Sequence, residues 1–467
     1  MTNNNEVYGY LPEEKPELGK LLLYALQQVI VMFPATITVA LITGFQVSTT
    51  LFASGLATLC FIFITGKKIP LYYGSSFAYL AAVMGLATSE GTAEQIAQWH
   101  ATGVLPTPLI SQAQFGIIMS GFISIAAGLL VRKFGKETVE KILPASITGP
   151  VSMIIGLTLA KSALGDAITV AEGTTAAFQN AWLVVSLVTF FSTVIYAKYL
   201  KGFLGQIPLL LGAATGCAAA ALFYFIGGNE LNLFQSISDD ALNSIWKMGP
   251  IAIPAFSLPT PSLKALVAIM PIAIATIPES TAHMYQLDIY VNDVAKKKGV
   301  ETKYDLVDLL DINLIGDGIC DMIAGAIGGP AGTNYGENIS TMAITRVFSV
   351  PVLTVASVIA MIVSCFTPLI KGIYAIPKPV IGGLEVYLFG AIAAQGIAIM
   401  IDKGVDMFSS KNIAVIASIM IIGLGGQYAF DGNIPFFGMS IPCVAGASIF
   451  GILLNALLSI GDNKKKE

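Results

Sequence analysis

Charged residues are scarce in this sequence: of 467 residues, 25 are Lys or Arg and 29 are Asp or Glu, which is 12% of the chain. Soluble domains usually carry about 25% charged residues, so a water-soluble globule of this size is excluded. The 55% of hydrophobic residues also excludes an intrinsically disordered chain. A net charge of −4 offers no basic surface, and we expect no nucleic-acid partner. An all-α polytopic membrane protein remains.

Cysteine and histidine are also rare. The five cysteines lie in or near apolar stretches and form no CxxC pair, which argues against a disulfide framework. The two histidines, His100 and His283, do not combine with cysteines into a zinc-binding cluster. Neither a GxxxxGK[ST] phosphate-binding motif nor a nucleophile–base constellation is present. We therefore expect no metal, no cofactor and no enzymatic activity.

Hydrophobic runs bounded by charge, Gly or Pro predict fourteen membrane spans. The spans of the first half cover about residues 20–41, 45–66, 70–88, 110–131, 139–162, 180–200 and 206–228. The spans of the second half cover about residues 265–287, 309–328, 331–348, 350–370, 376–398, 412–428 and 439–460. Residues 1–19 are polar and acidic, so we expect a cytoplasmic tail rather than a signal peptide.

The distribution of basic residues supports this topology, because cytoplasmic loops are enriched in Lys and Arg. If the N-terminus is cytoplasmic and fourteen spans alternate, most Lys and Arg residues fall on the cytoplasmic side. The exceptions are Lys161, Lys247, Lys264, Lys371 and Lys378. The pattern predicts a multi-pass protein of the cell (inner) membrane, in contact with lipid, with both termini in the cytoplasm.

The chain divides into two halves of seven predicted spans, residues 20–228 and 265–460, joined by a Pro-containing external loop at 229–264. Because seven is odd, the halves face opposite ways across the membrane, as in an inverted repeat. Span 3 begins with Tyr73-Gly74-Ser75 and span 10 with Tyr335-Gly336-Glu337. Small and helix-breaking residues there predict that both spans are part extended strand and part helix. Such broken segments at corresponding places indicate a midplane binding site.

A few carboxylates lie deep in the predicted spans: Glu279, Asp317, Asp321, Glu337 and Glu385. No Lys or Arg accompanies them, so each must face the interior, be paired or be protonated. His283 lies one helical turn after Glu279, on the same face. That pair is suited to a proton relay or to a structural helix–helix hydrogen bond. The roles of Asp317 and Asp321 are left open between packing and function, and Glu385 is expected to be a structural residue, on the gate face or at the interface.

Several segments carry a family resemblance. The stretch Gly332-Thr-Asn-Tyr-Gly-Glu-Asn-Ile-Ser-Thr-Met-Ala-Ile-Thr-Arg346 resembles the signature of the nucleobase/ascorbate transporter family (nucleobase:cation symporter type 2), specifically of its bacterial uracil permeases. Gly74-Ser-Ser-Phe-Ala-Tyr79 is similar to the third span of that family, and Ile376-Pro-Lys-Pro-Val-Ile-Gly-Gly383 to the start of its twelfth. Glu279 and His283 have the spacing that the family uses. The resemblance extends over about residues 20–460.

The resemblance implies a secondary active transporter that takes up a nucleobase, above all uracil, with protons by alternating access. Sodium as the coupling ion stays open. It implies that Glu279 and Glu337 accept the ring N–H groups of the base, and that backbone N–H groups near Phe77 and Gly336 donate to its carbonyl oxygens. The side chains of Phe77 and Tyr335 would flank the base.

Two departures from the family pattern concern the same site. Proton coupling is assigned by the resemblance to His283 and Glu279, but the family often has Gln-His in its first span where this chain has Gln27-Gln28. A histidine of the proton network is then absent, or its role falls to Gln28 or His283. Ser340 replaces the usual Gly of the signature, which would shift the pocket wall.

The family fold implies a core of spans 1–4 and 8–11, a gate of spans 5–7 and 12–14, and a homodimer formed through the gates. Two alternatives remain. A purine (xanthine or uric acid) symporter of the same family would differ in the base it binds, and Glu337 in place of Gln favours a pyrimidine. An anion carrier of the same seven-plus-seven fold would need a cation where spans 3 and 10 cross, and the sequence has none there.

Overall fold

The computed structural model describes residues 9–135, 137–171, 173–238, 240–242, 244, 246–301, 304–437 and 439–460. Residues 1–8 of the expected tail lie outside these ranges, as do the basic residues Lys136, Lys303, Lys464, Lys465 and Lys466.

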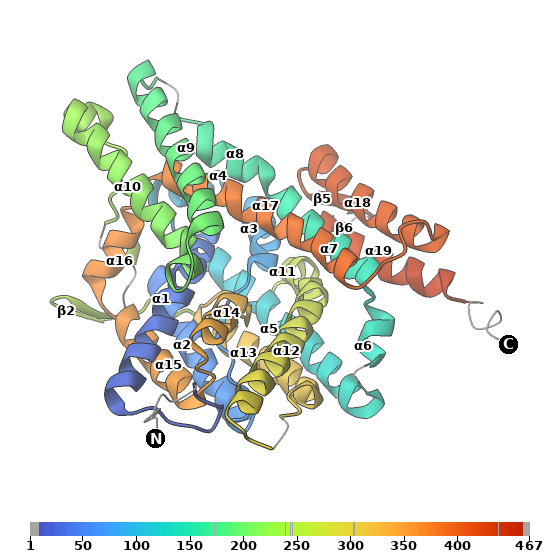
Figure 1. The fold of residues 1–467 in the computed structure, drawn as a ribbon. Helices are drawn as coiled ribbons and strands as arrows, with labels where there is room; N and C mark the ends of the chain where they lie inside the picture. Colours follow the sequence, from blue (N-terminus) through green and yellow to red (C-terminus); the bar gives the residue numbers. More distant parts are fainter. Residues whose placement is uncertain are drawn as a thin grey trace.

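The chain folds mainly into helices (Figure 1). Those of the first half are α1 (Leu18–Thr43), α2 (Val47–Ile64), α3 (Leu80–Glu90), α4 (Ala93–Thr102), α5 (Thr107–Phe134), α6 (Glu137–Ile142), α7 (Ala145–Thr158), α8 (Ala160–Ile168), α9 (Ala176–Tyr199) and α10 (Pro208–Gly227). Those of the second half are α11 (Leu263–Ile269), α12 (Ala273–Lys297), α13 (Leu310–Ile327), α14 (Gly336–Thr345), α15 (Val350–Ser364), α16 (Thr367–Tyr374), α17 (Lys378–Asp402), α18 (Ser410–Phe430) and α19 (Cys443–Leu458).

Each of the fourteen predicted spans contains helix. Within the described residues, nine helical stretches are long and apolar enough to cross a membrane, and Phe77–Glu90, Val350–Ser364 and Cys443–Leu458 are shorter apolar helices. Two spans differ clearly from their expected bounds: span 5 begins at Ala145, after Pro144, and continues through α8 to Ile168, and the helix of span 8 continues to Lys297. The predicted loop at 229–264 contains a hairpin of β2 (Trp246–Met248) and β3 (Ile251–Ile253).

Contacts between helices follow a two-fold relation between the halves. The second helix of the first half, α2, packs on α15, and its counterpart α13 packs on α5. Likewise α9 packs on α17, and its counterpart α18 packs on α7. Figure 1 shows the result, with α1 and α2 of the N-terminal half beside α15 of the C-terminal half. The two repeats therefore interlock, as an inverted repeat requires.

Two short strands meet where the repeats cross. β1 (Tyr73–Ser75) pairs antiparallel with β4 (Gly332–Asn334), with Gly74 opposite Thr333. Each strand supplies a glycine on which a tyrosine ring of the other segment lies. A β-carbon on Gly74 would be 2.2 Å from the Tyr335 ring, and one on Gly332 would be 2.3 Å from the Tyr73 ring. Only glycine permits both contacts.

This pairing corrects the expected correspondence between the Tyr-Gly dipeptides of spans 3 and 10. Tyr73 is the first residue of β1, whereas Tyr335 follows β4 and precedes the first residue of α14. The two Tyr-Gly dipeptides are therefore not at equivalent positions. The tyrosines play reciprocal parts instead, because each packs across the strand pair onto the glycine of the other half.

Asp321 of α13 fixes this strand pair. Its Oδ1 accepts a hydrogen bond from the Tyr73 hydroxyl of one half and, at 2.8 Å, another from the backbone N–H of Gly332 of the other half. Both donors are buried. One carboxylate oxygen thus joins β1, β4 and α13, which assigns Asp321 a structural part.

Asp317, one turn earlier on α13, belongs to a second buried network. It accepts from the Ser280 hydroxyl of α12 and, at 3.2 Å, from the Asn334 side chain of β4. Asn313 extends the network by donating to Ser280 over 2.8 Å and accepting from Asn334 over 3.1 Å. This network orients α12 against β4, and Ser280 is the neighbour of Glu279.

We predict that Asp321→Leu lowers thermal stability strongly while Asp321→Asn retains most of it. Leucine leaves two buried donors without an acceptor, at about 1–3 kcal/mol each, whereas the asparagine amide oxygen accepts both. Thermal unfolding of the purified protein in detergent measures the difference. Equal losses in both variants would show that the negative charge matters rather than these hydrogen bonds.

Candidate functional site

A cavity of about 1060 Å³ lies at the strand crossing. One wall comes from α12, from β1 and β4, and from the first turns that follow these strands. The opposite wall comes from α7 and α17. Six of the seven residues singled out from the sequence line it: Phe77, Glu279, His283, Tyr335, Gly336 and Glu337.

The carboxyls of Glu279 and Glu337 come from different helices, α12 and α14, and are close enough to interact electrostatically. Pro278, next to Glu279, lies inside α12 and lines the cavity too. His283 lies one turn further along α12 and approaches α14. A β-carbon on Gly336 would be only 2.9 Å from its Nε2, so any larger residue there would displace the imidazole.

The amino end of α14 points at the cavity. Tyr335 occupies the capping position without a side-chain cap, so the first backbone N–H groups of α14 have no backbone acceptor within the helix, and the Glu337 carboxyl interacts with the N–H of its own residue. The Tyr335 hydroxyl faces away from this end, where it donates to the Ser75 carbonyl over 3.0 Å and lies 3.0 Å from the Thr36 hydroxyl. These free N–H groups and the positive end of the helix dipole suit an electron-rich ligand oxygen.

Gln28 does not line the cavity. It is buried on α1, where its side-chain and backbone oxygens accept hydrogen bonds of 2.8 and 3.0 Å from the Asn338 amide. Asn338 follows Glu337 on α14. Gln28 thus supports the helix that carries Glu337 and contacts the cavity only indirectly.

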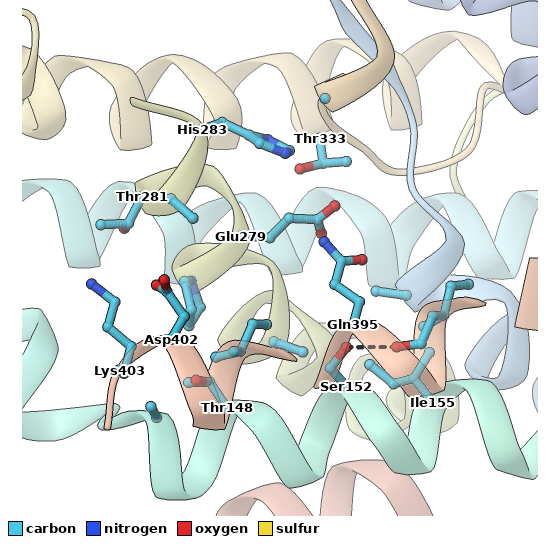
Figure 2. Close-up of a pocket in the computed structure, with 18 of the residues that line it drawn as sticks. Thr148, Ser152, Ile155, Glu279, Thr281, His283, Thr333, Gln395, Asp402 and Lys403 are labelled. Carbon is cyan, nitrogen blue, oxygen red and sulfur yellow. Dashed lines mark hydrogen bonds between the residues drawn. The ribbon is translucent and has the colours of Figure 1, made fainter. Parts of the chain in front are cut away.

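The opposite wall contains residues that the sequence reasoning missed. Figure 2 shows Gln395 of α17 extending toward Glu279, with Ser152 of α7 beside it and Thr148 one turn earlier on the same helix. Ser152 is itself held by α17, since its hydroxyl donates to the Ile392 carbonyl over 3.4 Å. On the wall formed by α12, β1 and β4, Thr333 of β4 faces the cavity close to His283. Gln395 is an isolated amide in an apolar span, which is the signal that would have revealed it.

His283 Nδ1 and Thr333 Oγ1 have no hydrogen-bond partner within the described part of the chain. Both atoms are buried and both residues line the cavity. Buried polar atoms without a protein partner usually bond to water or to a ligand. The wall formed by α12, β1 and β4 therefore offers a ligand two further polar atoms besides the two carboxyls. No group of three His, Cys, Asp or Glu side chains among the described residues could hold a metal ion.

The cavity reaches the end of α17, where Asp402, Lys403, Asp406 and Asn412 line it. The topology predicted from the basic residues places this end in the cytoplasm. Lys403 is the one Lys or Arg among the described lining residues, and its Nζ lies 5.5 Å from the centre of the Tyr285 ring. The strand crossing itself has no cation beside it, and its charges are carboxyls.

Comparison with known proteins decides the family. A family model described as "Permease family" matches residues 19–432. The chain belongs to this permease family. The uracil permease of Bacillus caldolyticus is 32% identical to the permease over 449 residues, which are 96% of this chain and 94% of the relative. The uracil permease of Escherichia coli (strain K12) is 29% identical over 439 residues, 93% of this chain and 92% of the relative. The resemblance found in the sequence is confirmed, and the protein is a permease rather than an enzyme.

Solved structures show the same fold at low identity. The murine Slc26a9 anion transporter in the inward-facing state matches 99% of the permease and 73% of its own chain, with a TM-score of 0.63 and 14% identity. The transmembrane domain of the cyanobacterial bicarbonate transporter BicA matches 94% of the permease and 97% of its own chain, with a TM-score of 0.53 and 13% identity. The expected seven-plus-seven inverted-repeat fold is thereby confirmed.

We predict that a cysteine at position 395 is reachable by water-soluble reagents from the cytoplasmic side. In a cysteine-free background, Gln395→Cys should react with a membrane-impermeant maleimide in inside-out vesicles and react slowly in right-side-out vesicles. The cysteine-free background replaces all five native cysteines by serine, buried Cys320 included. The unreactive control is Ala356→Cys, because Ala356 is a buried residue of α15. Faster labelling in right-side-out vesicles would reverse the orientation derived from the basic residues.

Proposed function

We propose that this permease takes up uracil together with protons by alternating access, with Glu279 and Glu337 holding the base. The observation that carries the proposal is the pair of carboxyls beside the uncapped amino end of α14, within one cavity. The names of the curated relatives, uracil permeases over nearly their full length, support a nucleobase as the substrate.

The donor and acceptor pattern of uracil fits these groups. Its ring alternates N–H donors with carbonyl acceptors along one planar edge. Carboxylate oxygens of Glu279 and Glu337 accept from the N–H groups, and backbone N–H groups at the start of α14 donate to a carbonyl oxygen. Phe77, half-buried at the cavity edge, offers a ring face to the planar base.

The same charges argue against an anion substrate, although the fold is shared with anion transporters. Two carboxyls at the crossing repel an anion, and the nearest cavity-lining cation, Lys403, lies at the far end of α17 beside Asp402. A purine substrate of the same family remains the second candidate. Strong competition by xanthine together with weak competition by uracil would favour it.

Proton coupling follows from the proximity of the two carboxyls. Two like charges that interact within one cavity repel each other, and one proton removes the repulsion. His283 lies beside Gly336 with its Nδ1 unpartnered, so it is placed to exchange a proton with this site. Binding of a neutral base and binding of a proton then favour the same state of the site.

Alternating access would move one wall of the cavity against the other. The wall with Glu279 and Glu337 belongs to spans 8 and 10, the proposed core, and the wall with Gln395 belongs to span 12 of the proposed gate. The opening beside Asp402 makes the present state inward-facing in the proposed topology. The gate helices α9, α10 and α18 are the least buried of the long apolar helices, which suits lipid contact and a homodimer through the gates.

We predict that Glu337→Gln abolishes most uracil binding and uptake. Replacing the carboxylate removes a charge-assisted hydrogen bond worth about 2 kcal/mol, which is roughly a thirtyfold loss of affinity. Uptake of radiolabelled uracil into proteoliposomes, with an imposed proton gradient, a sodium gradient or none, measures it. Glu90→Gln is the matched control, because Glu90 does not line the cavity and is paired with Lys264.

Two outcomes would count against the proposal. Unchanged uptake by the Glu337→Gln variant would remove Glu337 from the site. Uptake that is indifferent to the proton gradient would end the proton-symport claim, and stimulation by the sodium gradient alone would name sodium as the coupling ion.

We predict that His283→Ala impairs proton-driven accumulation more than uracil exchange at equilibrium. Without the imidazole, the base still meets Glu279 and Glu337, but proton movement to and from the site slows. Accumulation under a proton gradient and counterflow without one separate the two effects. His100→Ala is the control, because His100 stacks on Trp99 of α4, away from the cavity. Equal loss in both assays would make His283 a binding residue only.

A further inference from the structure

Glu385 of α17 stands out among the carboxyls that the proposed function does not use. One face of α17 lines the cavity with a stripe of residues: Leu388, Ala391, Ile392, Gln395, Ile399 and Asp402. Glu385 lies on the same side of the helix, nearly one turn before Leu388. It does not line the cavity, and its side chain is 0% exposed.

An apolar cluster separates Glu385 from the cavity. This cluster, the outer seal, consists of Val39, Ile42, Leu80, Leu159, Ala163, Leu388 and Phe389. It joins α1 and α3 of the proposed core to α8 and α17 of the proposed gate. Phe77, which borders the cavity, also packs against it. The seal thus closes the end of the cavity opposite Asp402.

Beyond the seal, α17 leads to the predicted outer surface. Lys378, the first residue of α17, lies seven positions before Glu385, about 10 Å along the helix axis. Its Nζ donates to the His100 carbonyl over 3.4 Å. Asp166 of α8 interacts electrostatically with both Lys378 and His100. Glu385 is therefore the innermost of a group of polar residues that begins at the outer surface.

Glu385 itself has no compensating partner. Neither of its carboxyl oxygens has a hydrogen-bond partner within the described ranges. Among the residues that the structure describes, the one charged group that interacts with it electrostatically is Asp166, which has the same sign. The helices packed against α17, and α17 itself, carry the following other titratable groups: Lys161 on α8, Tyr196, Lys198 and Tyr199 on α9, Cys217 and Tyr224 on α10, Lys378, Tyr387 and Asp402 on α17, and none on α7.

The seal helices add Lys20 and Tyr24 at the opposite end of α1, and Glu90 at the far end of α3. None of these groups offsets a charge on Glu385. A carboxylate buried in this way, without a cation or a donor, costs several kcal/mol. In the closed arrangement Glu385 is therefore held as the neutral acid.

We infer that Glu385 is a proton-binding site behind the outer seal, and that loss of its proton to external water holds the seal open. The step is a simple dissociation: the carboxyl O–H bond breaks, the proton passes to water, and the carboxylate stays hydrated. Closing the seal again buries the carboxyl, which requires the proton to return. Acidic external pH therefore favours the closed seal and alkaline pH the open one. This inference rests on the proposed alternating access.

The experiment follows the seal without any substrate. The five native cysteines, Cys60, Cys217, Cys320, Cys365 and Cys443, are replaced by serine, and Ala163→Cys introduces a thiol into the seal. Purified full-length protein in detergent is labelled with a maleimide between pH 6 and 8.5, with and without Glu385→Gln. Dividing the two rates at each pH cancels the ionisation of the thiol itself.

The expected result is a rate ratio that rises with pH, by up to about tenfold per unit, the limit set by release of one proton. Glu385→Gln stays neutral and keeps the seal closed, whereas Glu385→Asp restores the pH dependence. A ratio that is constant over this range would overturn the inference.

A second measurement needs no variant at Glu385. Hydrogen exchange of the unsubstituted protein, corrected for intrinsic rates, should increase with pH in Leu159–Ile168 and Lys378–Phe389 and stay constant in α13. No increase there would equally overturn the inference. Because neither assay uses uracil, failure of uracil transport would leave these results standing and would refute only the proposed substrate.

Discussion

The pairing of β1 with β4 is the contact on which the remaining structure depends. Three residues from each half of the chain pair antiparallel. Their backbone N–H and C=O groups bond to each other, because lipid offers these groups no hydrogen-bond partner. The pairing requires glycine at positions 74 and 332, since a tyrosine ring of the opposite segment occupies the space of each β-carbon. Asp321 completes it from α13. Everything that follows the strands, including the amino end of α14, is placed by this crossing.

The crossing explains why fold and substrate are separate questions in this architecture. Anion transporters of very low identity share the fold, so the scaffold does not choose the ligand. The choice lies in the side chains at the crossing. Here Glu279 and Glu337 bring two carboxyls to the amino end of α14, an arrangement suited to accept N–H groups and to repel an anion.

Much of this organisation could be predicted from the sequence because the membrane limits the chain to apolar helices with rare polar interruptions. The rarity of charge within the spans selected five carboxyls, and the family resemblance singled out Glu279 and Glu337 among them. Gln395 was not predicted, because a lone amide in an apolar span carries no charge and belongs to none of the segments that resemble the family. The register of the tyrosines was also missed, since a shared dipeptide shows similarity of composition and not of position within a strand.

Residues that act through other residues were harder to assign. Asp317 and Asp321 were left open because their partners, Ser280, Asn334 and Gly332, are remote in sequence and meet them only in the fold. Glu385 was expected to be interfacial, and its isolation from any donor became evident only once the helices around it were known. Gln28 was expected at the site, but it does not line the cavity. It accepts hydrogen bonds from Asn338, the neighbour of Glu337, instead.

The most direct measurement of the central claim is a structure of the permease with uracil bound. The account predicts that the base lies between α12 and α14, with ring nitrogens about 2.7–3.2 Å from carboxyl oxygens of Glu279 and Glu337 and a carbonyl oxygen at the amino end of α14. A base bound elsewhere, or bound in the cavity without contact to either carboxyl, would contradict it.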